Sequence, residues 1–261
     1  MSLLKRFSLL LAVAVLVACS QQEAPESAVP TTPAVAPVTA AEAPEPDEAD
    51  DVLFADVQPA HVVIKEAYVS ASTPQDNVDS PAHWVSPSGE AWVIATAKKS
   101  DQLMVYAGDT GELLRRVGRK GKDLGEFRRP NGIFVIDNLV FVVERDNHRV
   151  QLLHLPDFAP LGSFGEAELR QPYGLWVRAT ESGYEVRVSD AFMEGDDDNE
   201  VVPALEKLNE RFERFQVSLG EQGFRAEPAG SFGATDAAGA IRIPESIWGD
   251  VARDRLLLSE E

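Results

Sequence analysis

The stretch Gly125–Gly165, GEFRRPNGIFVIDNLVFVVERDNHRVQLLHLPDFAPLGSFG, has the pattern of one complete unit of four β-strands. Apolar residues alternate, or nearly alternate, through its first half after a predicted turn at Pro130–Gly132. The polar loop Arg145–Arg149 interrupts this pattern, because such residues cannot continue a half-buried strand. Val150–Leu153 is the predicted third strand and Leu161–Phe164 a short fourth. A four-stranded antiparallel sheet of about 40 residues is the size of one β-propeller blade.

The same proline-led strand start recurs along the chain, at Pro81, Pro130, Pro172 and Pro244. Repeats with a period of about 40–50 residues indicate a propeller. The longer last interval contains the acidic loop Phe192–Glu200 and a segment of helical composition, Pro203–Glu210. We interpret these as an insertion between the second and third strands of the third blade.

The number of blades is smaller than a closed ring requires. The pattern predicts an all-β propeller with about three and a half blades present, where six are expected in full. We therefore expect a C-terminally truncated piece of a larger propeller. A strand-like run before the first blade, His61–Lys65 with Ala67–Val69, is expected to complete the last blade. The complete protein is expected to be a monomer.

The N-terminus has the layout of an export signal. In residues 1–18, Lys5 and Arg6 precede an apolar run too short to span a membrane comfortably. The run ends in Leu16–Cys19, which resembles a bacterial lipobox and implies that Cys19 is lipidated. Residues 19–50, rich in Pro and Ala, are a predicted tether, and 51–261 the folded domain. Ser20 after the cysteine favours the outer membrane of a Gram-negative cell envelope, with membrane contact through the anchor only, and an extracellular location is the alternative.

Composition excludes several classes of function. The formal net charge of −19 makes the chain a poor nucleic-acid binder, because phosphate backbones repel it. With Cys19 as the single cysteine, one chain cannot form a disulfide. The four histidines are scattered and are interpreted as structural, and Asp196–Asp198 as an acidic surface loop rather than a cation site.

The opening stretch closely resembles an NHL repeat. It has the Pro130-x-Gly132 start, the Asn147–Arg149 loop and the closing pair Phe164–Gly165 of such repeats. This resemblance concerns the fold, because propellers carry many different functions.

Residues 55–261 as a whole resemble the β-propeller phytases. The resemblance begins with Asp79–Trp84, then Thr96–Lys99, then the strand Leu103–Tyr106. Further matches follow in the same order at Glu144-Arg145, Pro172–Leu175, Glu245 and Glu260-Glu261.

This resemblance implies a calcium-dependent phosphate-monoester hydrolase acting on phytate, a 3-phytase-like enzyme. It implies Ca²⁺ ligation by Asp79, Glu245 and Glu261, with Glu245 and Glu261 also catalytic. It further implies substrate binding by Lys98, Lys99, Arg145 and Tyr173. Calcium prefers carboxylate oxygens, and Lys or Arg binds phosphoryl oxygens, so these residue types suit that chemistry.

The chain also departs from the phytase pattern. Ser80 stands where the family has a second Asp, Ile133 where it has a carboxylate, and Ala191 where it has a phosphate-binding Lys. An alternative is therefore a non-catalytic NHL-type propeller that binds a ligand or an envelope partner. A lactonase-like calcium propeller is weaker, because it gives the Lys98-Lys99 loop no role.

A basic cluster stands out in this acidic chain, and it has two interpretations. It is either a rim that attracts anions or a set of solvated loops between blades, and the second is favoured. Its members are Arg115, Arg116, Arg119, Lys120, Lys122, Arg128 and Arg129.

Overall fold

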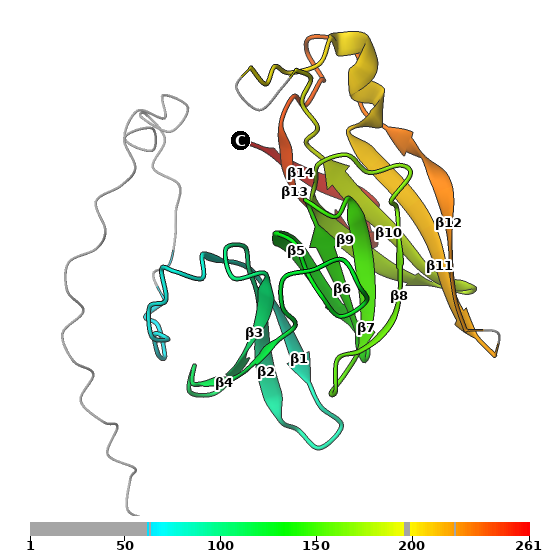
Figure 1. Ribbon diagram of the computed structural model, residues 1–261. Helices are drawn as coiled ribbons and strands as arrows, with labels where there is room; N and C mark the ends of the chain where they lie inside the picture. The colour runs from blue at the N-terminus through cyan, green and yellow to red at the C-terminus, as the bar shows by residue number, and fades with distance from the viewer. Residues whose placement is uncertain (1–61, 63, 196–198, 222) are drawn as a thin grey trace, which may run out of the picture. The chain divides into compact units, whose positions relative to one another are not determined.

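The computed structural model describes residues 62, 64–195, 199–221 and 223–261. These lie almost entirely in one compact unit, Ile64–Glu261 (Figure 1). The predicted signal, Cys19, the tether and Asp196–Asp198 fall outside the described residues. Within the described residues, no helix is long and apolar enough to cross a membrane.

The chain forms three four-stranded antiparallel sheets and one two-stranded sheet, each with its strands in sequence order (Figure 1). This confirms the predicted all-β, propeller-type fold. The first sheet contains β1 (Val78–Val85), β2 (Ala91–Ala97), β3 (Gln102–Ala107) and β4 (Leu113–Val117). The second contains β5 (Pro130–Ile136), β6 (Leu139–Glu144), β7 (Arg149–His154) and β8 (Ala159–Phe164). The third contains β9 (Pro172–Thr180), β10 (Gly183–Asp190), β11 (Phe212–Gly220) and β12 (Gly223–Phe232). The last contains β13 (Pro244–Asp250) and β14 (Arg255–Glu260). We call these sheets blades 1 to 4.

The blades stack face to face on apolar side chains, and their first strands lie next to one another. Strand β5 contacts both β1 and β9, and β9 also contacts β13. Between blades 1 and 2 the core includes Trp92 and Val142, and between blades 2 and 3 it includes Phe141 and Val188. Consecutive side chains of a strand point to opposite faces of a sheet, and consecutive residues of β6 and β7 are buried. Blade 2 is therefore apolar on both faces and packs between its two neighbours.

The insertion in blade 3 is found where the sequence predicts it. The chain leaves β10 at Asp190 and returns as β11 at Phe212. Between them lies a short 3₁₀-helix, η2 (Leu205–Glu210), whose Leu208 is fully buried. A second 3₁₀-helix, η3 (Val251–Arg253), joins β13 to β14.

Two local predictions are wrong. Residues 64–73 form no strand. A strand needs a neighbouring edge to bond its backbone, and here Tyr68 instead donates its hydroxyl hydrogen to Gly108 O of blade 1, 2.8 Å away. The predicted turn at Pro130–Gly132 is the beginning of β5, where an irregular register makes room for the Pro-Asn-Gly sequence.

Candidate functional site

Each first strand contains a β-bulge at the same place. In each blade the pairing of the first strand with the second is irregular at one place, where the first strand has an extra residue. In blade 2 this irregularity lies between the pairs Pro130↔Glu144 and Ile133↔Val142. Two residues fall within each irregularity, and they are equivalent from blade to blade. These pairs are Asp79-Ser80, Asn131-Gly132, Tyr173-Gly174 and Glu245-Ser246. Bulges of this kind redirect side chains and are frequent beside functional sites.

The four bulges form a continuous row because neighbouring first strands approach closely there. A Cβ atom on Gly132 would lie 2.6 Å from Tyr173 O, and one on Gly174 would lie 2.5 Å from Glu245 O. Hydroxyl groups make the other links: Thr96 Oγ1 donates to Asn131 O at 2.6 Å. Ser189 Oγ donates to Glu245 O at 2.5 Å. We call Asp79, Asn131, Tyr173 and Glu245 the bulge row.

Three predicted site residues meet at this row. Lys98 Nζ lies 2.8 Å from Asp79 Oδ2 and donates a hydrogen bond to the Tyr173 hydroxyl at 3.1 Å. The contact with buried Asp79 Oδ2 is an ion pair that lacks hydrogen-bond alignment. Burial by itself lowers the pKa of Lys98, but the contacts with Asp79 and Tyr173 outweigh it, and the pKa is raised. Lys98 is therefore a fixed cation that links blade 1 to blade 3.

Asn131 is a member of the row that the sequence analysis did not select. Its side chain is fully buried, and neither Oδ1 nor Nδ2 has a hydrogen-bond partner among the described residues. A buried amide without partners is costly, so a ligand or water is expected to satisfy it. The spacing shared by Pro130-Asn131-Gly132 and Pro172-Tyr173-Gly174 is the signal that could have identified it.

A second set of equivalent positions follows the second strands. In each blade, one residue at the end of the second strand pairs with the beginning of the first strand, and the equivalent position is the residue directly after it. These positions hold Lys98, Arg145, Ala191 and Glu261. In an antiparallel sheet these ends and the bulges share one edge, so Lys98 and Arg145 belong to the same side of adjacent blades. Arg145 is half-buried, and its guanidinium has no hydrogen bond or ion pair with a described residue. Lys99 is exposed, and its backbone N–H donates to Asp76 O.

The acidic residues just before these positions hold loops in place. Glu144 accepts a hydrogen bond from Arg128 N, Asp190 from Arg170 N and Gln171 N, and Glu260 from Arg242 N. Burial raises the pKa of Glu144 and of Asp190, although their hydrogen bonds act in the opposite direction. Each carboxyl group fixes the segment that enters its own blade. In the predicted acidic pair, Glu260 is therefore structural.

The expected calcium ligands do not form a donor set in the described part of the chain. Asp79 is paired with Lys98, Glu245 is half-buried, and Glu261 is exposed directly after β14. Among residues 64–195, 199–221 and 223–261, no group of three or more Asp, Glu, His or Cys side chains is arranged to hold a metal. Calcium needs six to eight oxygen ligands, so these residues do not fit it as they stand.

Most of the basic cluster is occupied by contacts within the protein. Arg116 makes two hydrogen bonds of 2.7 Å to Asp76 and lowers the pKa of that carboxyl group to about 2. Arg115 lies over the rings of Trp92 and Phe158, Arg119 pairs with Glu126, and Lys120 pairs with Asp101. These contacts favour the interpretation as loops between blades over that of a free anion-attracting rim.

No protein-family model matches this chain, and no curated protein sequence does. Several solved structures are similar to it at low identity. Hydrazine synthase of Kuenenia stuttgartiensis has a TM-score of 0.40 and 10% identity, over 69% of this chain and 40% of its own. Streptogramin B lyase has a TM-score of 0.40 and 14% identity, over 73% and 50%. BamB from Moraxella catarrhalis has a TM-score of 0.29 and 8% identity, over 70% and 56%.

The chain thus spans between 40% and 56% of the length of these three structures. Similarity at this level concerns the fold, and it transfers no activity. The resemblance to phytases therefore rests on the sequence motifs.

Proposed function

We propose that the bulge row binds a phosphate-bearing small molecule. The observation that supports this most is the Lys98 ammonium group, which is held between Asp79 and Tyr173 with 18% of its side chain exposed. An ammonium group has three donors, and Lys98 uses one of them in its hydrogen bond to the Tyr173 hydroxyl, while the contact with Asp79 is an ion pair. A donor is therefore free for a phosphoryl oxygen, and the raised pKa is consistent with a cation at neutral pH.

Arg145 extends the same site on the neighbouring blade. It occupies the position equivalent to Lys98, and its guanidinium is unpaired among the described side chains. Guanidinium groups bind phosphate through two parallel hydrogen bonds. Two cations on adjacent blades suit a ligand with several phosphate groups, and phytate is the ligand that the sequence motifs suggest. The rest of the chain is acidic, so a local cationic site would select such anions without attracting nucleic acid.

A second candidate function is the calcium-dependent hydrolysis of phytate. The position of Glu245 at the fourth bulge, with its backbone bonded to Ser189 of the blade that carries Tyr173, favours it. We derive no catalytic step from it, because the described residues do not assemble the oxygen ligands that calcium requires. Binding and hydrolysis are therefore separable by experiment.

Calorimetric titration of phytate into the purified protein tests the binding. Lys98→Met should raise the Kd by roughly tenfold or more, because one charged hydrogen bond to the ligand is lost. Lys207→Met removes a charge that pairs with Glu194 on the insertion and belongs to neither set of equivalent positions, and it should leave the Kd unchanged. An unaltered Kd in Lys98→Met, with the circular dichroism spectrum retained, would reject the site.

Phosphate release from phytate, measured with calcium and with a chelator, separates the two candidate functions. Release that requires calcium and is lost in Glu245→Gln would establish hydrolysis. Binding without release under any metal would establish the binding protein.

A further inference from the structure

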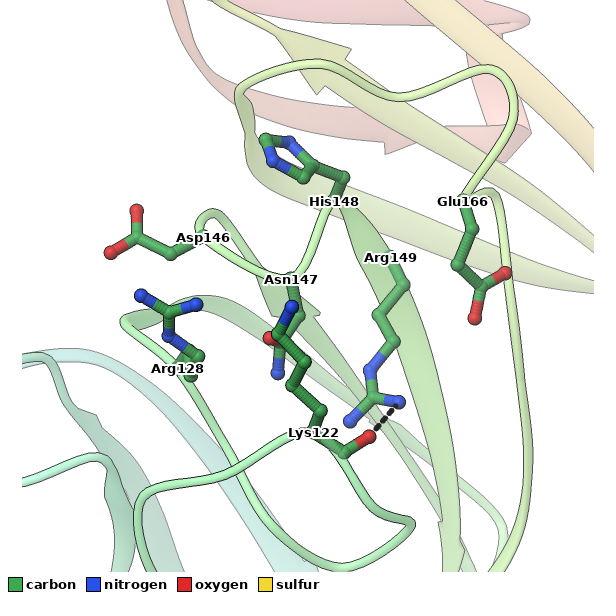
Figure 2. A pocket seen from close by; sticks show the side chains of 7 residues that line it. All are labelled: Lys122, Arg128, Asp146, Asn147, His148, Arg149 and Glu166. Carbon is green, nitrogen blue, oxygen red and sulfur yellow. Dashed lines mark hydrogen bonds between the residues drawn. The ribbon is translucent and has the colours of Figure 1, made fainter.

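A separate polar pocket of about 330 Å³ lies at one edge of blade 2 (Figure 2). Three connections form it: the one between β4 and β5, the loop between β6 and β7, and the segment after β8. Its volume is in the range of small-molecule sites. The residues that face a ligand here are Lys122, Arg128, Asp146, Asn147, His148 and Glu166.

One wall of this pocket is fixed by Arg149. This side chain, 8% exposed, donates to Glu144 Oε1 and to the backbone oxygens of Lys122, Asp123 and Glu126, at 2.7–3.3 Å. Figure 2 marks its bond to Lys122 O. These bonds join β7 to the connection between blades, so the pocket is organised before any ligand binds. They also occupy Arg149, whose charge is balanced by Glu144 and is not available to a ligand.

The remaining charges of the pocket add up to zero. Lys122 and Arg128 have no side-chain hydrogen bond or ion pair with any described residue, and Asp146 has none either. Glu166 accepts one hydrogen bond, from Ser163 Oγ. Two cations and two carboxylates therefore line the pocket, with Asp146 and Glu166 on opposite sides of it (Figure 2). A dianion such as phosphate would satisfy the cations but would be repelled by the carboxylates, whereas a ligand with both charges satisfies all four.

Asn147 and His148 are held in the pocket by hydrogen bonds, and Asn147 keeps an acceptor that lacks a donor. Asn147 Nδ2 donates to Gly121 O and to Glu144 Oε2, which fixes the orientation of the amide. Its Oδ1 is buried and has no partner among the described residues. His148 Nδ1 bonds Arg170 O, and because a carbonyl oxygen can only accept, Nδ1 carries a hydrogen. Asn147 Oδ1 therefore offers an acceptor to an N–H or O–H group of a ligand.

We propose that this pocket binds a zwitterionic small molecule with a carboxylate and an ammonium group, of the class of free amino acids and short peptides. Lys122 and Arg128 receive the carboxylate. Asp146, which unlike Glu166 accepts no hydrogen bond from a described residue, receives the ammonium group, and Asn147 Oδ1 accepts an N–H. The inference does not depend on the bulge row, which uses other residues.

The test uses three forms of one dipeptide in calorimetric titrations at pH 6.5, where a terminal amine is charged. L-Alanyl-L-alanine carries both charges, its N-acetyl derivative only the carboxylate, and its C-terminal amide only the ammonium group. We expect the dipeptide to bind and each derivative to bind roughly tenfold more weakly, the effect of one charged hydrogen bond. Failure of the dipeptide to bind, or equal binding of either derivative, overturns the proposal.

Variants assign the two ends of the ligand. Asp146→Asn should weaken binding of the dipeptide and leave that of the N-acetyl derivative unchanged. Lys122→Met should weaken binding of both and leave that of the amide unchanged. Two control variants lie outside the pocket. Arg225→Gln removes an exposed charge and should change none of these values. Lys98→Met should also change none of them, so that a failure of the dipeptide proposal can be told apart from a failure of the proposal for the bulge row. Equal losses in Asp146→Asn and Arg225→Gln contradict the assignment.

Discussion

At the residue scale, the equivalent bulge position carries a different side chain in each of the four blades. These side chains give the row both charged and neutral polar groups. The bulge position holds Asp79, Asn131, Tyr173 and Glu245 in successive blades. Three of these could be selected from the sequence because they lie in recognisable motifs. Asn131 was not selected, because Pro-Asn-Gly is typical of a turn when its strand partner is unknown, and only the spacing that it shares with Pro172-Tyr173-Gly174 indicates its place. The side-chain contacts of Lys98 with blade 3 were equally invisible, since they join residues far apart in the chain.

Glu213 makes stability depend on pH. It is 8% exposed, and burial, followed by the charges of Asp190 and Glu210, raises its pKa from 4.5 to about 7. The folded state therefore keeps its proton between pH 4.5 and 7 while the unfolded chain loses it. Stability from this group is present below pH 4.5 and is lost as the pH rises to 7, by up to about 3 kcal/mol.

Urea unfolding of the wild type and of Glu213→Gln at pH 5 and pH 7.5 measures this effect. The wild type should lose more unfolding free energy than the variant on going to pH 7.5, because glutamine cannot ionise. Glu227→Gln, a change at an exposed site, should behave as the wild type. Identical pH dependence in the wild type and Glu213→Gln would contradict the assigned pKa.

At the scale of elements, strands were predicted well where hydrophobic alternation and turns agreed. Strand β3 (Gln102–Ala107) extends one residue beyond the predicted Leu103–Tyr106 at each end, and the insertion before β11 was placed correctly. The strand expected near residues 64–69 was wrong, because an apolar pattern does not show whether a partner edge is near. The bulges could not be predicted from the sequence either, because an irregular register is a property of two paired strands.

The close approach of the first strands predicts a specific sensitivity to added methyl groups. Gly132→Ala and Gly174→Ala each place a Cβ within 2.6 Å of a neighbouring carbonyl oxygen, so the first strands must move apart. We expect each to cost roughly 1–3 kcal/mol, the usual effect of overpacking. Gly220→Ala is the matched control, since a Cβ there meets no atom within 4 Å. Melting temperatures compare the three, and an equal effect of Gly220→Ala would contradict the packing of the row.

At the scale of the whole molecule, propeller-type blades carry one polar row along their first strands. The stacking of the blades was predictable from repeats alone, whereas the charge balance at the row was not. The three predicted calcium ligands included Asp79, which forms an ion pair with Lys98 in the structure. Anchoring through Cys19 and placement in the envelope stay predictions from the N-terminal motif. The described blades present cationic side chains beside unpaired polar side chains, and a ligand at the bulge row can contact both.

The most direct test of this account is the position of a bound phosphate analogue. A crystal of the protein soaked in tungstate should show an anomalous peak for tungsten roughly 4 Å from Lys98 Nζ, with an oxygen of the anion between them at hydrogen-bond distance, and on the side of Arg145. Lys98→Met crystals treated in the same way should lack that peak. A wild-type crystal with the bulge row empty and tungstate bound only elsewhere would contradict the central claim.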